Sequence, residues 1–343
     1  MKKFLCALVA VSWLAMSPAQ AAPREDVLKL RDDRPKEYVV VKGDTLWDIS
    51  ARFLESPWRW TDVWDMNADI YNPHLIYPGD VIYLVWENGK PVLKVRRGIR
   101  KLTPQARVEP LDQAIPAIPL KDILSFLEEA RVMDQERYKE APYILAGKNE
   151  RLISAAGDRV YARGAPLEEL RRQVVYRATN EYIDPDSGEH LGYELTKVSD
   201  VTLEDEQGDI LSLVVNRSVL ETRSLDRVLP AEEHRVQSVF YPQPSPADLD
   251  GKILSVLGAV NDGGQFDVVA LNRGLREGLE AGHVFAIYRT GEKLVDPVTK
   301  ELLQLPSERS GLLMVFKAFE KVSYGLIMQS SNVVSVGDEI REP

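Results

Sequence analysis

The chain has 343 residues, of which 44% are hydrophobic, enough to build folded cores in two or three domains. Its formal charge is −10 at pH 7, and acidic and basic residues are interspersed. An acidic chain of this kind is poorly suited to bind nucleic acid or an anionic lipid surface, so neither is expected as a main partner.

The first 22 residues have the pattern of a cleavable export signal. Lys2 and Lys3 form a positive end, residues 4–16 are an apolar run, and Ala19-Gln20-Ala21 offers a small-x-small cleavage site. The apolar run is shorter than a membrane-spanning helix needs, and no later segment approaches that length. We therefore expect a signal peptide at residues 1–22, export to a bacterial periplasm, and no transmembrane segment after cleavage.

Composition also limits the possible chemistry. The only cysteine, Cys6, lies inside the export signal, so the mature chain has no disulfide, thiolate metal site or cysteine nucleophile. The histidines are isolated in the sequence, without the close spacing of zinc hydrolases: His74, His190, His234 and His283. We expect no metal, no cofactor and no catalytic residues, although a glycosidase that needs only two carboxylates stays open.

The mature chain divides by composition. Residues 23–36 are charged and without periodicity, which is typical of a flexible leader. All tryptophans after the signal lie between residues 37 and 86: Trp47, Trp58, Trp60, Trp64 and Trp86. Four prolines in residues 98–120 predict a Pro-rich linker, and the apolar spacing of residues 120–139 favours a short helix. From Pro142 onward the pattern is one of short strands and turns.

The second half contains an internal repeat. Two sets of residues match at an offset of 112: Tyr176-Arg177, Asp184-Pro185, Glu189, Leu191 and Asp226-Arg227-Val228 with Tyr288-Arg289, Asp296-Pro297, Glu301, Leu303 and Asp338-Glu339-Ile340. Arg163-Gly164 resembles Arg273-Gly274 at an offset of 110. We expect two related β-rich units, at residues 143–230 and 252–343, each a small barrel or sandwich. Convergence on a common hairpin motif is the alternative.

Residues 37–85 predict a small strand–helix–helix–strand domain. Tyr38–Val41 is a short β-branched strand, and Thr45 with Asp48 has the spacing of a capping box that opens a helix. Ser56-Pro57 is a second helix start, and residues 81–84 form a closing strand. The spacing of Trp60 and Trp64 favours burial in the core of this domain over a role as sugar platforms, whereas the patterns around Trp58 and Trp86 leave their roles open.

Two blocks in this segment resemble the LysM family. They are Tyr38-x-Val40-x-x-Gly43-Asp44-Thr45-Leu46-Trp47-x-Ile49 and Asn72-Pro73-x-Leu75-Ile76-Tyr77-Pro78-Gly79-Asp80, with Asn67 between them. The resemblance implies two helices packed on a two-stranded sheet, and a shallow groove that binds N-acetylglucosamine-containing glycans such as peptidoglycan. Carried over by position, the groove is formed by two facing segments: Gly43, Asp44, Thr45 and Leu46, and Pro73, His74, Leu75 and Ile76.

The chemistry of these residue types suits an acetamido sugar. Backbone groups on turns can pair with the sugar amide, while Leu46, Pro73 and Ile76 can cover its methyl group and one face of the ring. Gly43 allows a positive φ and a close approach of the backbone. For Thr45 and Asp48, the alternative to lining the groove is a purely structural role, because helix capping alone explains why these residue types occur at this spacing.

The order of the parts resembles the type IV pilus secretin-associated family, in which a LysM module precedes a domain like that of flagellar assembly protein T. Residues 157–164, Tyr182–Pro185 with Leu191-Gly192-Tyr193, and Val268–Gly274 with Gly282–Arg289 carry this second resemblance. We therefore expect an α+β multidomain protein, a βααβ LysM module followed by a linker and two related barrel- or sandwich-like units.

The resemblance implies a non-catalytic scaffold that anchors an outer-membrane secretin ring to the cell wall, in the periplasm. Two alternatives remain open. One is a peptidoglycan-remodelling enzyme, and the other is a generic wall-binding protein of a different envelope machine.

Overall fold

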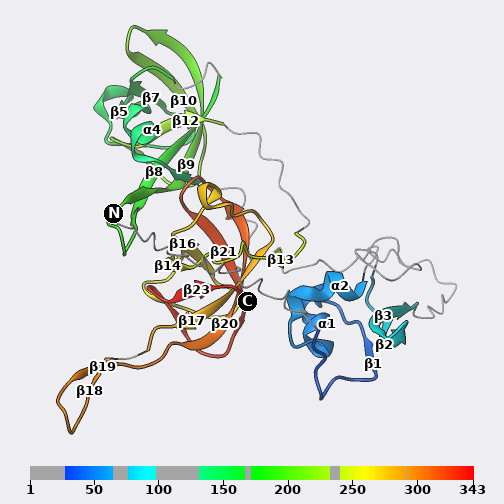
Figure 1. The fold of residues 1–343 in the computed structure, drawn as a ribbon. Coiled ribbons are helices and arrows are strands. Elements are labelled where there is room, and N and C mark those ends of the chain that lie inside the picture. Colours follow the sequence, from blue (N-terminus) through cyan, green and yellow to red (C-terminus); the bar gives the residue numbers. More distant parts are fainter. Residues whose placement is uncertain (1–27, 65–75, 98–130, 167–170, 232–239, 292) are drawn as a thin grey trace, which may run out of the picture.

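The computed structural model describes residues 28–64, 76–97, 131–166, 171–231, 240–291 and 293–343 (Figure 1). These residues are mostly in β-strands, with a few short helices. The expected signal peptide, the whole of the expected linker at 98–120, and Pro73, His74 and Leu75 lie outside the described residues. None of the helices in the described ranges is long and apolar enough to cross a membrane.

The N-terminal module has the predicted order of strand, helix, helix and strand, with one strand more. Its elements are β1 (Glu37–Val39), α1 (Leu46–Phe53), the 3₁₀ turn η1 (Pro57–Arg59), α2 (Trp60–Trp64), β2 (Val81–Glu87) and β3 (Lys90–Arg96). The strands form an antiparallel sheet in the order β1-β2-β3. The sequence did not predict β3, which pairs with β2 along its whole length and buries Val92 and Leu93.

The core of this module includes the face of α1 that the helical spacing predicted. Leu46, Ile49 and Phe53 are buried in one cluster with Trp60 and Trp64, so the prediction that these two tryptophans are core residues is confirmed. Part of the expected leader also belongs to the module. Leu28 and Leu30 pack against the same core, and the Arg31 backbone N–H donates to the Phe53 carbonyl at 2.9 Å. The end of α1 gives this segment a hydrogen-bonding partner that its own sequence does not reveal.

The first β-rich part begins with β4 (Arg131–Met133) and α4 (Gln135–Glu140). The sequence predicted a helix over 120–139; within the described part of that range, the structure has a short strand followed by a short helix. Six strands then close into a ring in the order β5-β12-β8-β9-β10-β7: β5 (Tyr143–Gly147), β7 (Arg159–Arg163), β8 (Arg172–Ile183), β9 (His190–Gln207), β10 (Ile210–Ser218) and β12 (Arg227–Pro230). We call this ring the first barrel. The short elements β6 (Ile153–Ser154), β11 (Thr222–Arg223) and η3 (Lys148–Glu150) lie outside the ring.

A second ring has the same strand order. It runs β14-β23-β17-β20-β21-β16: β14 (Gly251–Val256), β16 (Val268–Leu271), β17 (His283–Arg289), β20 (Glu308–Ala318), β21 (Ser323–Ser330) and β23 (Glu339–Arg341). We call it the second barrel. Its remaining elements are β13 (Gln243–Pro244), β15 (Asp262–Gly263), η4 (Leu275–Glu277), β18 (Lys293–Val295), β19 (Leu302–Gln304) and β22 (Val334–Ser335). The predicted β-rich second half is confirmed; the exact unit boundaries stay predictions.

Each ring has one apolar cluster to which all six of its strands contribute, which places that cluster inside the barrel. In the second barrel this interior includes Ile253, Phe285, Val315 and Ile340. In the first it includes Ile144, Val175, Leu213 and Val228. Alternate residues along each strand point to opposite faces of a sheet, so the residues between these positions form the outer face.

The outer face of the second barrel is also apolar, and other parts of the chain cover it. Alternate strand residues such as Ala270, Val284 and Met314 are buried there in a second cluster. That cluster also contains Trp47 from α1 of the LysM-like module, Phe240, and Tyr182 and Leu191 from the first barrel. The outer face of the second barrel therefore joins the described parts of the chain.

Tyr182 and Leu191 belong to the tip of the β8–β9 hairpin, residues 182–193, which we call the first hairpin. The Asn272 amide donates to the buried Asp184 carboxylate at 3.1 Å. Glu189 forms ion pairs with Arg276 and Lys321, each at 2.7 Å, and Asp186 pairs with Lys252. Hydrogen bonds from Arg276 and Lys321 lower the pKa of Glu189 to about 2. Polar contacts at the hairpin tip thus border the apolar contact.

Acidification should loosen the first hairpin from the second barrel. With the first hairpin in place, the pKa of Glu189 is about 2, below its ordinary value of 4.5. The ion pairs of Glu189 therefore stabilise the contact fully above pH 4.5, and this stabilisation is lost as the pH falls toward 2. Small-angle scattering and limited proteolysis across this range should show the loosening. Glu189→Gln should reduce the acid-induced change, while Glu301→Gln, at the matching position 112 residues later, should behave like the wild type. Identical acid profiles for all three proteins would contradict this assignment.

Candidate functional site

The turn before α1 has the backbone conformation that the sequence predicts for the groove. Gly43 has a φ of +101°, and the space around its Cα is open. The side chain of Asp44 points inward, where its carboxylate accepts hydrogen bonds from the Val41 backbone N–H at 2.8 Å and from the Tyr38 hydroxyl at 2.9 Å. Burial, and then the hydrogen bond to Asp44, raise the pKa of Tyr38. The Asp44 side chain therefore fixes the shape of the turn.

Thr45 caps the helix that follows. Its hydroxyl accepts the Asp48 backbone N–H at 3.1 Å, and the Asp48 carboxylate accepts the Thr45 backbone N–H at 3.2 Å and its hydroxyl proton at 2.7 Å. This reciprocal pair is the capping box that the spacing of the two residues predicted. Capping accounts for the buried Thr45 side chain without any ligand.

The last two described groove residues are part of the module core. Leu46 and Ile76 are 1% and 0% exposed and pack in one cluster. Their side chains are therefore not at the surface, so a sugar could reach these positions through their backbone only, unless the turns open. In the turn before α1, the exposed residues are Val41, Lys42 and the predicted groove residue Gly43. Glycan contact by the predicted groove residues stays a prediction.

A second turn, Tyr77–Asp80, lies directly beside the first. The Val40 backbone N–H donates to the Asp80 carbonyl and the Gly79 N–H donates to the Val40 carbonyl, both at 2.8 Å. The Asp80 carboxylate accepts the Tyr77 backbone N–H at 3.1 Å and pairs with Arg97 at 2.7 Å. The two sequence blocks that define the family pattern are thus brought together by backbone hydrogen bonds.

Sequence reasoning missed the role of Trp47. This residue follows Leu46 and points away from the module core, into the cluster on the outer face of the second barrel, where Trp58 also packs. Trp60 adds a ring contact to Tyr241, with centroids 6.3 Å apart. The available signal was a large apolar residue on α1 outside its Leu46–Ile49–Phe53 face. Trp86, in contrast, is 62% exposed on β2.

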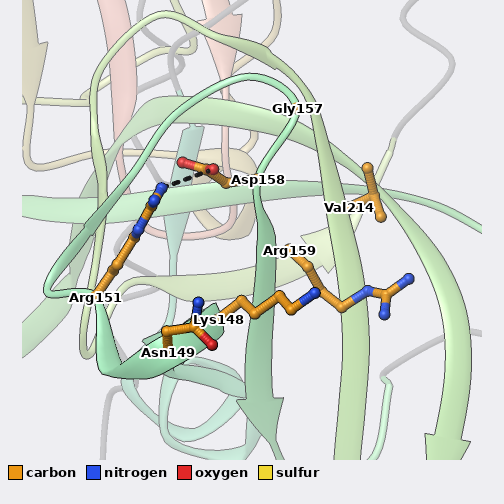
Figure 2. A pocket seen from close by; sticks show the side chains of 7 residues that line it. All are labelled: Lys148, Asn149, Arg151, Gly157, Asp158, Arg159 and Val214. Atoms are coloured by element: carbon orange, nitrogen blue, oxygen red, sulfur yellow. Dashed lines mark hydrogen bonds and ion pairs between the residues drawn. The ribbon is translucent and has the colours of Figure 1, made fainter.

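A hollow of about 330 Å³ lies on the first barrel (Figure 2). It is lined by Lys148, Asn149, Arg151, Gly157, Asp158, Arg159 and Val214. Arg151 pairs with Asp158 at 3.2 Å, and Arg159 pairs with Glu204 outside the hollow. Residues 157–159 lead from a turn into β7. Carboxylates partner both arginines, and Lys148 is the lining cation for which no ion pair is found among the described residues.

No group of three or more metal-ligating side chains comes together within the described ranges. The two described histidines, His190 and His283, each contact a different glutamate. His190 lies within 3.0 Å of Glu181, and His283 accepts the Glu280 backbone N–H at 2.9 Å. Burial lowers the pKa of His283. These contacts explain both imidazoles as local structural groups.

Comparison with known proteins identifies residues 38–85 as a LysM domain. The predicted family of this segment is confirmed, and the adjoining turns described above are its defining blocks. LysM is a binding module for peptidoglycan or other carbohydrate and is not catalytic. A Bacillus subtilis (strain 168) protein, "Uncharacterized protein YqbP", is 33% identical over 75 residues, which is 18% of this chain. The matched part covers about a third (34%) of the length of that relative.

Removing the helix cap should destabilise the LysM domain measurably. Thr45→Ala loses the hydroxyl that caps the Asp48 N–H, so we expect a loss of about 1 kcal/mol in the free energy of unfolding of the domain. Thr45→Ser keeps the oxygen and should retain most of the stability. Tryptophan fluorescence is the suitable probe, because all tryptophans beyond residue 22 lie between 47 and 86. Equal stability of the alanine and serine variants would show that the cap has no energetic role.

Proposed function

We propose that this protein is a non-catalytic periplasmic scaffold that binds peptidoglycan through its LysM domain and holds an outer-membrane secretin ring to the cell wall. The LysM match at residues 38–85, with both of its turns folded side by side, is the observation that carries the binding part. The export pattern of residues 1–22 supports a periplasmic location, associated with the wall and the outer-membrane complex.

The turn geometry suits an N-acetylglucosamine-containing glycan. The first turn ends in an exposed glycine at positive φ, so a sugar can approach the backbone without meeting a side chain. The side chains of Asp44 and Thr45 are occupied by internal hydrogen bonds. We therefore assign glycan recognition here to backbone N–H and C=O groups, with Thr45 and Asp44 as positioning residues.

A single module of this kind binds weakly. Each neutral hydrogen bond contributes about 1 kcal/mol net, and a shallow groove offers few of them. Firm attachment to a wall requires several copies held together, so that binding of one raises the effective concentration of the others. A multi-subunit ring supplies such an arrangement, which supports an assembly of many copies over an isolated protein.

The junction between the LysM domain and the second barrel supports a mechanical role. Trp47 and Trp58 are packed in the apolar cluster on the outer face of that barrel, and the Trp60 ring contacts Tyr241. Trp47 lies only four residues after the turn glycine Gly43. A load on the glycan-binding turn would therefore pass through packed aromatic side chains to the barrel.

The secretin part of the proposal rests on the resemblance of the whole chain to the type IV pilus secretin-associated family. The repeated barrels are consistent with it, because they offer a large β-rich surface beyond the glycan site. A generic wall-binding protein of another envelope machine is the competing function.

Peptidoglycan binding should depend on the turn glycine and not on glycines elsewhere in the domain. Gly43→Val places a β-branched residue at a φ of +101° in the proposed groove, and sedimentation with insoluble peptidoglycan should fall several-fold. Gly89→Val is the matched control, because Gly89 also has positive φ (+77°) and open surroundings but lies in the β2–β3 turn. Equal binding by the two folded variants would refute the groove assignment.

The secretin should co-purify with the wild-type chain from cross-linked envelopes. Its absence from the recovered proteins would remove the secretin part of the proposal. The same purified chain, incubated with peptidoglycan, should release no muropeptides. Their release would instead establish a wall-remodelling enzyme, because a binding scaffold breaks no glycosidic or peptide bond.

A further inference from the structure

The repeat gives the protein two hairpins with the same turn but different surroundings. The second, residues 293–304, contains β18 and β19 and extends from the second barrel (Figure 1). In the first hairpin the Asp184 N–H donates to the Glu189 carbonyl at 2.8 Å. In the second, the Asp296 N–H donates to the Glu301 carbonyl at 2.8 Å. Each aspartate also accepts two backbone N–H groups of its own turn, and these bonds lower the pKa of Asp296.

Matched positions in the two hairpins differ sharply in burial. Tyr182 and Leu191 are 3% and 2% exposed because they pack on the outer face of the second barrel. Their counterparts 112 residues later, Leu294 and Leu303, are 48% and 47% exposed. The flanking side chains of the second hairpin are exposed as well: Val295, Val298, Leu302 and Leu305. Five apolar side chains on one protruding hairpin, with Leu305 directly after it, form a candidate interaction surface.

The acidic groups of the second hairpin also lack the partners that their counterparts have. Glu189 is held by Arg276 and Lys321, whereas no ion pair to Glu301 is found among the described residues. One oxygen of Asp184 accepts the Asn272 amide, whereas the described contacts of the Asp296 carboxylate all lie within its own turn. The second hairpin thus presents apolar side chains and a carboxylate that remain available to a partner.

The first hairpin shows what surface such a hairpin fits. Its docking surface is an apolar outer face of a β-barrel, bordered by a buried carboxamide and by basic side chains. Because its turn matches that of the first hairpin, the second hairpin fits a sheet face of the same chemistry. Such a face has a basic side chain opposite Glu301, as Glu189 has, and a hydrogen-bond donor opposite Asp296, as Asp184 has.

In a second copy of this chain, the described residues of neither barrel offer a free surface of this kind. The outer face of its second barrel is already covered by its own Tyr182 and Leu191. On its first barrel, Asp209 stands where the second barrel has Lys321, and it pairs with Arg163 at 2.8 Å. The alternate residues along the neighbouring strand β7 include the exposed Arg159 and Arg163, which an apolar hairpin cannot cover.

We propose that the second hairpin is the docking element for a different protein, one that presents an apolar β-sheet face bordered by basic side chains. This inference rests on the proposed function, under which that partner is the secretin. The hairpin would seat Leu294 and Leu303 on the partner sheet, as Tyr182 and Leu191 are seated within this chain, and Glu301 would pair with a lysine or arginine at its border.

The test compares full-length variants in cross-linked envelopes. Leu294→Asp combined with Leu303→Asp should reduce the secretin that co-purifies by at least about tenfold, since buried apolar anchors dominate such interfaces. Leu152→Asp and Val260→Asp are matched controls, because both residues are more exposed, at 82% and 91%, and lie outside the hairpin. The controls should retain the secretin. The hairpin variant should keep the wild-type melting temperature and sediment with peptidoglycan as before, since its substituted residues are outside both barrels.

The outcomes separate this inference from the function on which it rests. If the wild-type chain recovers no secretin, both fall together. If the wild type and the hairpin variant recover equal amounts, the hairpin is not the docking element, while the scaffold function stands. A wild-type dimer in sedimentation velocity that the hairpin variant abolishes would overturn the choice of partner in favour of a second copy. Glu301→Arg should also weaken co-purification several-fold, and unchanged recovery would contradict the predicted basic border.

Discussion

The outer face of the second barrel is the constraint on which the described arrangement depends. A small barrel needs apolar residues only in its interior. This barrel has apolar residues on both faces of its sheet: Val269 points into the interior, and its neighbour Val268 lies on the outer face. Apolar surface exposed to water costs roughly 25 cal/mol per Å², so the outer face requires a cover. Trp47, Phe240 and Tyr182 supply it from three separate parts of the chain. Burial of this face accounts for the contact between those parts.

This cover also involves the helix that follows the turn at Gly43 and Asp44. Helix α1 has two apolar sides: Leu46, Ile49 and Phe53 close the LysM core, and Trp47 faces the second barrel. The capping box at Thr45 fixes where that helix begins, so it also fixes the direction in which Trp47 points. Through Trp47 the LysM domain packs directly against the second barrel. Under the proposed scaffold function, a load on this turn would reach the second barrel through this aromatic packing.

Local patterns predicted the features that depend on neighbours in sequence. The capping box and the core positions of Trp60 and Trp64 follow from short-range patterns, and the structure shows both of them. Features set by distant contacts could not be predicted in this way. The run Val268–Leu271 is apolar at every position, so alternation cannot tell interior from outer face. The packing of Leu30 and the pairing of β3 likewise depend on partners far along the chain.

The two hairpins show the same local turn in two different surroundings. The Asp-Pro turn is stabilised by its own backbone hydrogen bonds, so it folds the same way whether or not anything lies against it. What differs is the side chain directly after the turn proline: Asp186, which pairs with Lys252 inside the chain, or Val298, which is 86% exposed. An intramolecular contact can use a charge whose partner is fixed nearby. Exposed apolar residues are costly in isolation, and their presence on a turn that does not need them for folding is best explained by a surface that covers them.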